Sequence, residues 1–164
     1  MNEIMLFIDG SVSTKLKIGY GAYLSVSKNE HSLESYKTQV KLKRFDNTSS
    51  SKLEIQTLLW ALNDIQPLKK DVIIYTDSQN IMSLLKRHDY LKQNDFHSKK
   101  KNRLSNYELY KEYYRKIEEL NCKFIKVQGH KPSDHKDYID RLFSFVDKAA
   151  RKALRNDLSN IQNK

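Results

Sequence analysis

The stretch of sequence that decides the fold covers residues 49–87 and reads SSSKLEIQTLLWALNDIQPLKKDVIIYTDSQNIMSLLKR. Its first part predicts a helix from Lys52, with Ser50 or Ser51 as its cap and Pro67 beyond its end. One helical face is approximated by Leu53, Leu58, Leu59, Leu62 and Ile65. This spacing has the period of a helix packed on a core.

The second part of this stretch changes to a strand pattern. Residues 71–77, DVIIYTD, predict a short buried strand, and residues 78–87 predict a helix that begins directly after Asp77. Upstream, partial alternation and β-favouring residues predict three antiparallel strands. These strands lie in EIMLFID (3–9), GYGAYLSVS (19–27) and SYKTQVKLKRF (35–45).

The C-terminal half continues the alternation of helices and strands. Residues 89–103 are irregular and basic, 106–120 predict a helix, and CKFIKVQ (122–128) predicts a fifth strand. After a polar loop, a last helix passes through Ala149, Ala150, Ala153 and Leu154. The order predicts an α/β fold, a five-stranded mixed sheet with three antiparallel strands followed by two parallel ones, flanked by helices.

Composition limits the class of protein. The 164 residues fit one domain, and a net charge of +10 favours a polyanionic partner such as nucleic acid. A basic but inert surface is the alternative. The single cysteine, Cys122, excludes an intramolecular disulfide and a Cys-based zinc site. We expect a cytoplasmic monomer with no membrane contact, because no leader pattern or apolar run of about 20 residues is present.

Three acidic residues occupy positions that can converge. Asp9 ends the first predicted strand, Asp77 ends the fourth, and Glu54 lies in the first turn of a helix. Ligands of open sheets bind outside the carboxyl ends of the strands. Clustered carboxylates must be stabilised by cations, for which Mg²⁺ is the natural candidate, or be partly protonated. Each residue also has a structural interpretation, as a turn residue, a helix-dipole partner or a helix cap.

The ordered motifs resemble those of the type 1 ribonucleases H over nearly the whole chain. They are FIDGS (7–11), GYGAYL (19–24), SSSKLEIQTLLWAL (49–62), YTDSQNI (75–81), VQGHK (127–131) and VDKAARKAL (146–154). The resemblance implies a ribonuclease H-like fold, with a ribonuclease H domain at 1–155 and a frayed C-terminal tail at 156–164.

The resemblance implies a catalytic site for two Mg²⁺ ions, with Mn²⁺ as a substitute. The metal-binding residues carried over are Asp9, Glu54, Asp77 and Asp147, and His130 falls on the flexible catalytic histidine of the family. Asp140, ten residues after His130, is the alternative fourth ligand. We prefer Asp147, because the small side chains that follow it match the final helix of the family.

Substrate contacts are also implied by the resemblance. They fall on Gly10, Ser11, Ser49, Ser50, Ser51, Ser78 and Gln79. Ser50 and Ser51 replace the asparagine pair that is frequent in the family, but serine can still donate and accept hydrogen bonds. Residues 86–103 occupy the place of a basic protrusion, where Lys99, Lys100 and Lys101 are expected to contact DNA, and a solvated charge run is the alternative.

The function implied is that of an endoribonuclease that hydrolyses the RNA strand of RNA–DNA hybrids. A two-metal mechanism would leave 5′-phosphate and 3′-hydroxyl ends, and His130 would transfer protons or assist product release. A related polynucleotidyl transferase or junction resolvase is one alternative, since folds host several chemistries. A hybrid-binding module with a decayed site is another.

Overall fold

The structure, a computed structural model, describes residues 3–27, 32–66, 70–129 and 131–163. Its sheet has the order β3-β2-β1-β4-β5, in which β1 pairs antiparallel with β2 and parallel with β4. The strands are β1 (Glu3–Ser13), β2 (Ile18–Ser27), β3 (Lys41–Asp46), β4 (Asp71–Thr76) and β5 (Asn121–Lys126). The predicted mixed sheet, three antiparallel strands followed by two parallel ones, is confirmed.

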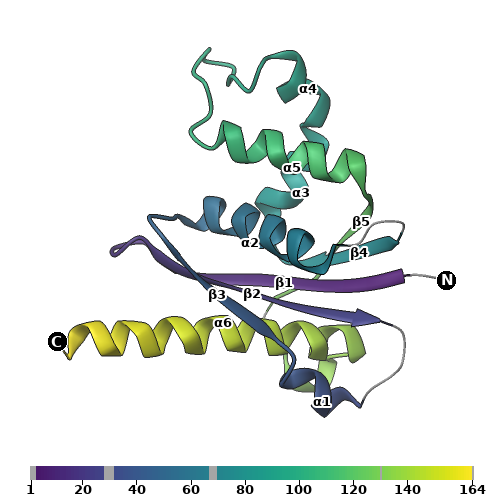
Figure 1. Cartoon of the computed structure of the whole chain (residues 1–164), viewed down its shortest axis with the longest axis vertical. Helices are drawn as coiled ribbons and strands as arrows, with labels where there is room; N and C mark the ends of the chain where they lie inside the picture. Colours follow the sequence, from purple (N-terminus) through teal and green to yellow (C-terminus); the bar gives the residue numbers. More distant parts are fainter. Residues whose placement is uncertain (1–2, 28–31, 67–69, 130, 164) are drawn as a thin grey trace.

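Helices cover both faces of the sheet (Figure 1). One core joins the sheet to α2 (Ser50–Ile65), α3 (Gln79–Lys86), α4 (His88–Gln93) and α5 (Tyr107–Glu119). A second core joins the opposite face to α1 (Leu33–Lys37) and α6 (Tyr138–Gln162). A short 3₁₀ helix, η1 (Ser133–His135), precedes α6. The sheet therefore separates the α3–α5 side of the molecule from the α6 side.

Serine caps fix where the two central helices begin. Ser49, rather than Ser50 or Ser51, is the N-cap of α2, and its Oγ accepts from the N–H of Lys52 at 3.3 Å. Ser78 is the N-cap of α3, and its Oγ accepts from the N–H of Ile81 at 3.0 Å. Each cap satisfies a donor that a first helical turn leaves unpaired.

Two predictions of local structure are wrong. The third strand was expected over residues 35–45, but Leu33–Lys37 form α1 and the strand begins only at Lys41. Tyr36 explains the difference, because its side chain is buried in the core on the α6 side. The irregular segment at 89–103 includes most of α4, which buries Leu91 completely.

The last helix is longer than the sequence indicated. It begins at Tyr138, where Asp137 and Asp140 form a capping box, so the helix starts well before Ala149. It continues to Gln162, so residues 156–162, expected as a tail, are helical. Asp157 holds this end on the sheet, because it accepts hydrogen bonds from Tyr20 Oη at 3.0 Å and Arg44 Nε at 2.7 Å.

Candidate active site

The register of the parallel strands places two carboxylates side by side. The pairing of β1 with β4 reaches Phe7 opposite Tyr75, whose rings stack with centroids 4.7 Å apart. Asp9 and Asp77 each lie two residues beyond this pair. Asp77 directly follows the end of β4, but β1 continues past Asp9 to Ser13, so the prediction that Asp9 ends the first strand is wrong. The geometry therefore brings Asp9 and Asp77 together, as the sequence predicted.

Glycines bring the third carboxylate close to the sheet. A Cβ atom at Gly10 or Gly19 would lie 2.9 or 2.7 Å from Leu53 Cδ2, and one at Gly21 would lie 2.3 Å from Thr57 Oγ1. Real Cβ atoms do not approach so closely, so α2 packs on β1 and β2 at a distance that only glycine permits. The N-terminal half of α2, which carries Glu54, is thereby held against β1.

A pocket forms where these elements meet. Its walls include Asp9, Gly10, Glu54, Asp77 and Ser78. Among the described residues, the Oε2 atom of Glu54 is buried and has no hydrogen-bond partner. A buried carboxylate oxygen without a partner is costly, so this atom is suited to a cation or a donor from a ligand.

The electrostatics of the pocket reflect crowded carboxylates. Burial, followed by the charge of Asp77 and contact with Asp147, raises the pKa of Asp9 from 3.8 to about 8, although the N–H of Gly10 donates to Asp9 Oδ1 at 2.9 Å. Burial also raises the pKa of Glu54, against the hydrogen-bonding side chains of Ser78 and Asn80. The carboxylates destabilise one another when ionised, and a cation would relieve that repulsion.

The two candidates for the fourth carboxylate have different surroundings. Asp147, on α6, contacts Asp9. Asp140 instead pairs with Lys131 at 3.0 Å and accepts from the N–H of Asp137 at 3.2 Å in the capping box. Although burial opposes it, these partners lower the pKa of Asp140. The structure thus brings Asp147 to the pocket and engages Asp140 in holding the start of α6.

The donor set fits hard divalent cations. In the described part of the chain, no three His, Cys, Asp or Glu side chains surround a single point closely enough to hold an ion unaided. Mg²⁺ commonly binds through one or two carboxylates and completes its shell with water and substrate phosphate. Paired carboxylates, together with the unpartnered Oε2 of Glu54, fit this mode of Mg²⁺ coordination.

The other predicted residues lie around the pocket or apart from it. Ser51 O accepts from Asn80 Nδ2 at 3.5 Å, and Gln79 Oε1 accepts from Lys126 Nζ at 2.5 Å. Ser11 follows Gly10 in β1, and Ser49 and Ser50 lie at the start of α2. His130 lies outside the described residues.

Two neighbours of the pocket were not predicted. A Cβ atom at Gly129 would lie 3.0 Å from Asp77 Oδ2, so this glycine leaves room for the carboxylate. Lys126 ends β5 level with Thr76, which places a cation beside the strand end that carries Asp77. The only signal for Lys126 in the sequence is its position near the end of a predicted strand.

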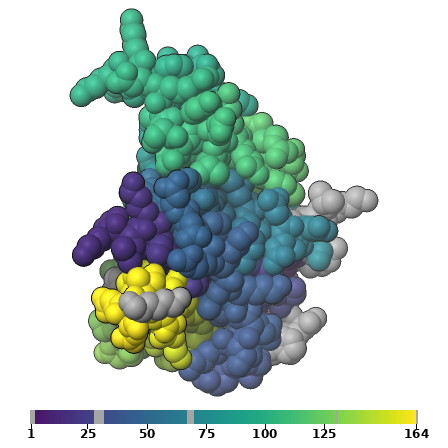
Figure 2. All heavy atoms as spheres, turned by 60° about the vertical axis from the view of Figure 1, so that its left-hand side comes forward, coloured from purple at the N-terminus to yellow at the C-terminus, as the bar shows by residue number. Residues whose placement is uncertain are grey.

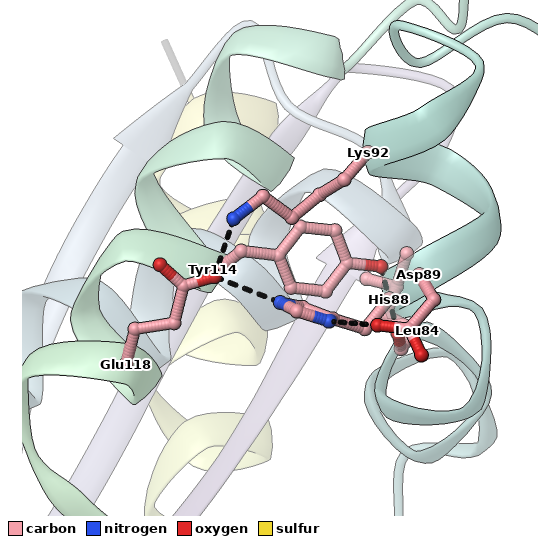
Figure 3. Close-up of polar contacts among 6 residues, drawn as sticks. All are labelled: Leu84, His88, Asp89, Lys92, Tyr114 and Glu118. Atoms are coloured by element: carbon pink, nitrogen blue, oxygen red, sulfur yellow. Dashed lines mark hydrogen bonds and ion pairs between the residues drawn. The ribbon is translucent and has the colours of Figure 1, made fainter.

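The three lysines at 99–101 lie between α4 and α5, in an arm formed by residues 87–106 that projects from the body (Figure 2). They do not line the carboxylate pocket. The arm joins the body through His88, which contacts Asp89 Oδ1 at 3.0 Å and Glu118 Oε1 at 2.8 Å (Figure 3). Lys92 Nζ donates to the same Glu118 oxygen at 2.7 Å.

The fold and the pocket define an α/β protein in which carboxylates from β1, α2 and the residue after β4 line one pocket. The family model described as RNase H matches residues 1–155, and the chain belongs to the RNase H family. Membership supports a nuclease of the ribonuclease H type.

Known proteins similar to this chain agree with that assignment. A ribonuclease H of Caldicellulosiruptor saccharolyticus is 25% identical over 159 residues, which are 94% of this chain and 98% of that protein. The solution structure of the PFV RNase H domain is 21% identical with a TM-score of 0.73, over 92% of this chain and 93% of that one.

A structure of the foamy viral protease-reverse transcriptase in complex with RNA/DNA hybrid is 12% identical with a TM-score of 0.65. It covers 92% of this chain and 19% of that one. At these identities, the two solved structures establish a shared fold. Separately, no helix among the described residues is both long and apolar enough to cross a membrane.

Proposed function

We propose that this chain is an endoribonuclease that hydrolyses the RNA strand of RNA–DNA hybrids. The observation that carries the proposal is the convergence of Asp9, Glu54, Asp77 and Asp147 from four separated segments of the chain. The active unit is residues 1–155, the range that the family model matches. The hybrid bound to the similar reverse transcriptase structure supports this choice of substrate.

The four carboxylates would hold two Mg²⁺ ions, or Mn²⁺ in their place. Asp9 interacts with Asp147 and feels the charge of Asp77, so it would contribute to the binding of both ions. Glu54, which interacts with Asp77, would share one ion with it, and Asp147 would complete the other. When bound, such a pair supplies an activated water and stabilises the leaving oxygen, which leaves 5′-phosphate and 3′-hydroxyl ends.

Selection of RNA must come from other residues, because metal ions contact only phosphate. The 2′-hydroxyl distinguishes RNA from DNA, and Ser50, Ser51 and Gln79 offer donors and acceptors beside the pocket. Gly10, Ser11, Ser49 and Ser78 complete the proposed substrate contacts. His130 would carry protons at this site, and Lys99, Lys100 and Lys101 would bind the DNA strand electrostatically.

The test is a cleavage assay on labelled RNA–DNA hybrid, double-stranded RNA and duplex DNA, each with and without Mg²⁺. We expect cutting of the hybrid alone, only with Mg²⁺, and products with 5′-phosphates. Asp77→Asn should remove most of this activity, and relief of carboxylate repulsion should keep its melting temperature at or above that of the wild type. A folded wild-type protein that binds hybrid in Mg²⁺ without cutting it would support the decayed-site alternative.

A further inference from the structure

A second concave surface adjoins the carboxylate pocket on the α6 side. This α6 groove has a volume of about 230 Å³, and its lining includes Gln128, Lys131, Lys136, Phe143, Asp147 and Lys148. Asp147 belongs to its wall and also contacts Asp9 in the pocket. The groove is therefore continuous with the carboxylate cluster.

The groove carries an excess of positive charge. Its four cations are Lys131, Lys136, Lys148 and Arg151, and its two carboxylates are Asp140 and Asp147. Lys131 pairs with Asp140 at 3.0 Å, and Arg151 Nε pairs with Asp147 Oδ1 at 3.0 Å. Among the described residues, Lys136 and Lys148 belong to no ion pair. Two positive charges remain for an anionic ligand.

The floor of the groove strengthens these charges. Phe143 is only 5% exposed and lies beneath the cations as part of the core on the α6 side. Apolar walls of low dielectric focus the field of nearby charges and raise the local concentration of counter-ions. A phosphodiester group is an anion of suitable size and charge for such a surface.

We propose that the α6 groove binds the backbone phosphates of the RNA strand next to the bond that is cut. This inference rests on the proposed function. The reason for choosing RNA is continuity: the scissile phosphate lies at the carboxylates, and Asp147 forms both that site and the groove wall. The strand that passes over Asp147 toward Lys148 is therefore the strand that is cut.

The arm is on the other side of the sheet, which leaves the groove to the RNA strand. Helices α3–α5 pack in one core and α6 packs in the other, with the sheet between them (Figure 1). A duplex laid across the carboxylates can thus present its DNA strand to Lys99, Lys100 and Lys101 and its RNA strand to Lys136 and Lys148. The two basic surfaces would bind different strands of one substrate.

The experiment combines lysine variants with single neutral linkages in the substrate. Hybrids that carry one methylphosphonate at each position, in either strand, are bound in Mg²⁺ by the Asp77→Asn protein, which leaves them uncut. We expect one or two linkages in the RNA strand to weaken binding. Lys136→Ala/Lys148→Ala should abolish that sensitivity and lower the slope of log K against log salt by about 0.9 for each lost phosphate contact.

The matched control is Lys152→Ala, which removes an exposed lysine of α6 outside the groove. It should retain the sensitivity, as should Lys136→Arg/Lys148→Arg, which keeps both charges. Unchanged sensitivity in the double alanine variant, or a sensitive linkage confined to the DNA strand, would overturn the groove assignment. A separate assay decides the proposed function: if wild-type protein fails to cut hybrid, that proposal fails irrespective of the groove.

Discussion

The close packing of α2 on the sheet gives the sharpest test of how the site is built. Gly21→Ala would place a methyl carbon 2.3 Å from Thr57 Oγ1 and 3.0 Å from Thr57 Cγ2. Thr57 is only 1% exposed, so it has little space to move away. Overpacking of this kind costs about 1–3 kcal/mol. For a chain of this size, we expect the melting temperature to fall by about 2–4 °C per kcal/mol.

The same geometry predicts a rescue. Thr57→Ala removes the two nearest atoms, Oγ1 and Cγ2, and leaves only Cβ at 3.1 Å. In the described part of the chain the Thr57 hydroxyl is buried without a hydrogen-bond partner. Loss of an unpaired hydroxyl offsets part of the loss of packing. The double variant Gly21→Ala/Thr57→Ala should therefore be more stable than the sum of the single changes predicts, with an interaction energy of about 1 kcal/mol or more.

Activity should follow the position of α2. Glu54 lies one turn before Thr57 on the same helix, so a displaced α2 moves this carboxylate away from Asp9. Misplacement by about 1 Å can cost on the order of 10²-fold in rate. We would measure thermal unfolding and hybrid cleavage for both single variants and the double variant, with Ser25→Ala on β2 as the control. Wild-type stability and activity in Gly21→Ala would refute the reasoning.

Three further changes test other parts of the structure. Asp147→Asn should abolish or severely reduce cleavage at equal foldedness, whereas Asp140→Asn should spare it; the opposite ranking would move the ligand role to Asp140. His88→Ala should remove a pH-dependent part of the stability, because Asp89 and Glu118 raise the pKa of His88. This stabilisation is complete below the unfolded-state pKa and is lost as pH rises through the higher folded-state pKa. Identical melting temperatures for variant and wild type at every pH would contradict it. Asp157→Ala should cost about 1–3 kcal/mol through loss of two hydrogen bonds that hold the end of α6; unchanged protection of residues 156–162 in hydrogen exchange would contradict it.

The elements with strong apolar periodicity could be predicted from the sequence. The helix after Ser49 and the strand before Asp77 have the patterns of buried elements, and their order implies the mixed sheet. The side-by-side position of Asp9 and Asp77 follows as well, since Asp9 lies in, and Asp77 directly after, two strands that are parallel neighbours. These features depend on local hydrophobic patterns and on the handedness of strand connections, both of which can be inferred from one sequence.

The features that escaped prediction depend on tertiary contacts. Tyr36 favours a strand by propensity, but its burial against the α6 side stabilises a short helix instead. Residues 156–162 are polar and resemble a frayed end, yet Asp157 reaches Tyr20 and Arg44, which are more than 100 positions away. The contact between Gly21 and Thr57 likewise joins two elements that no sequence window includes.

The choice between Asp140 and Asp147 shows why distance along the sequence could not decide the site. The two residues are seven apart on α6, which is close to two helical turns, so they lie on nearly the same side of the helix. They differ by about 10.5 Å along its axis. Because β1 crosses α6 at a fixed place, only one of the two levels reaches Asp9, and Asp147 is at that level. Asp140 is at the N-terminal end, where its carboxylate accepts from the N–H of Asp137 and pairs with Lys131. A ligand role for Asp140 would therefore break the capping box. A ligand role for Asp147 requires only that a metal ion replace the ion pair between Asp147 and Arg151.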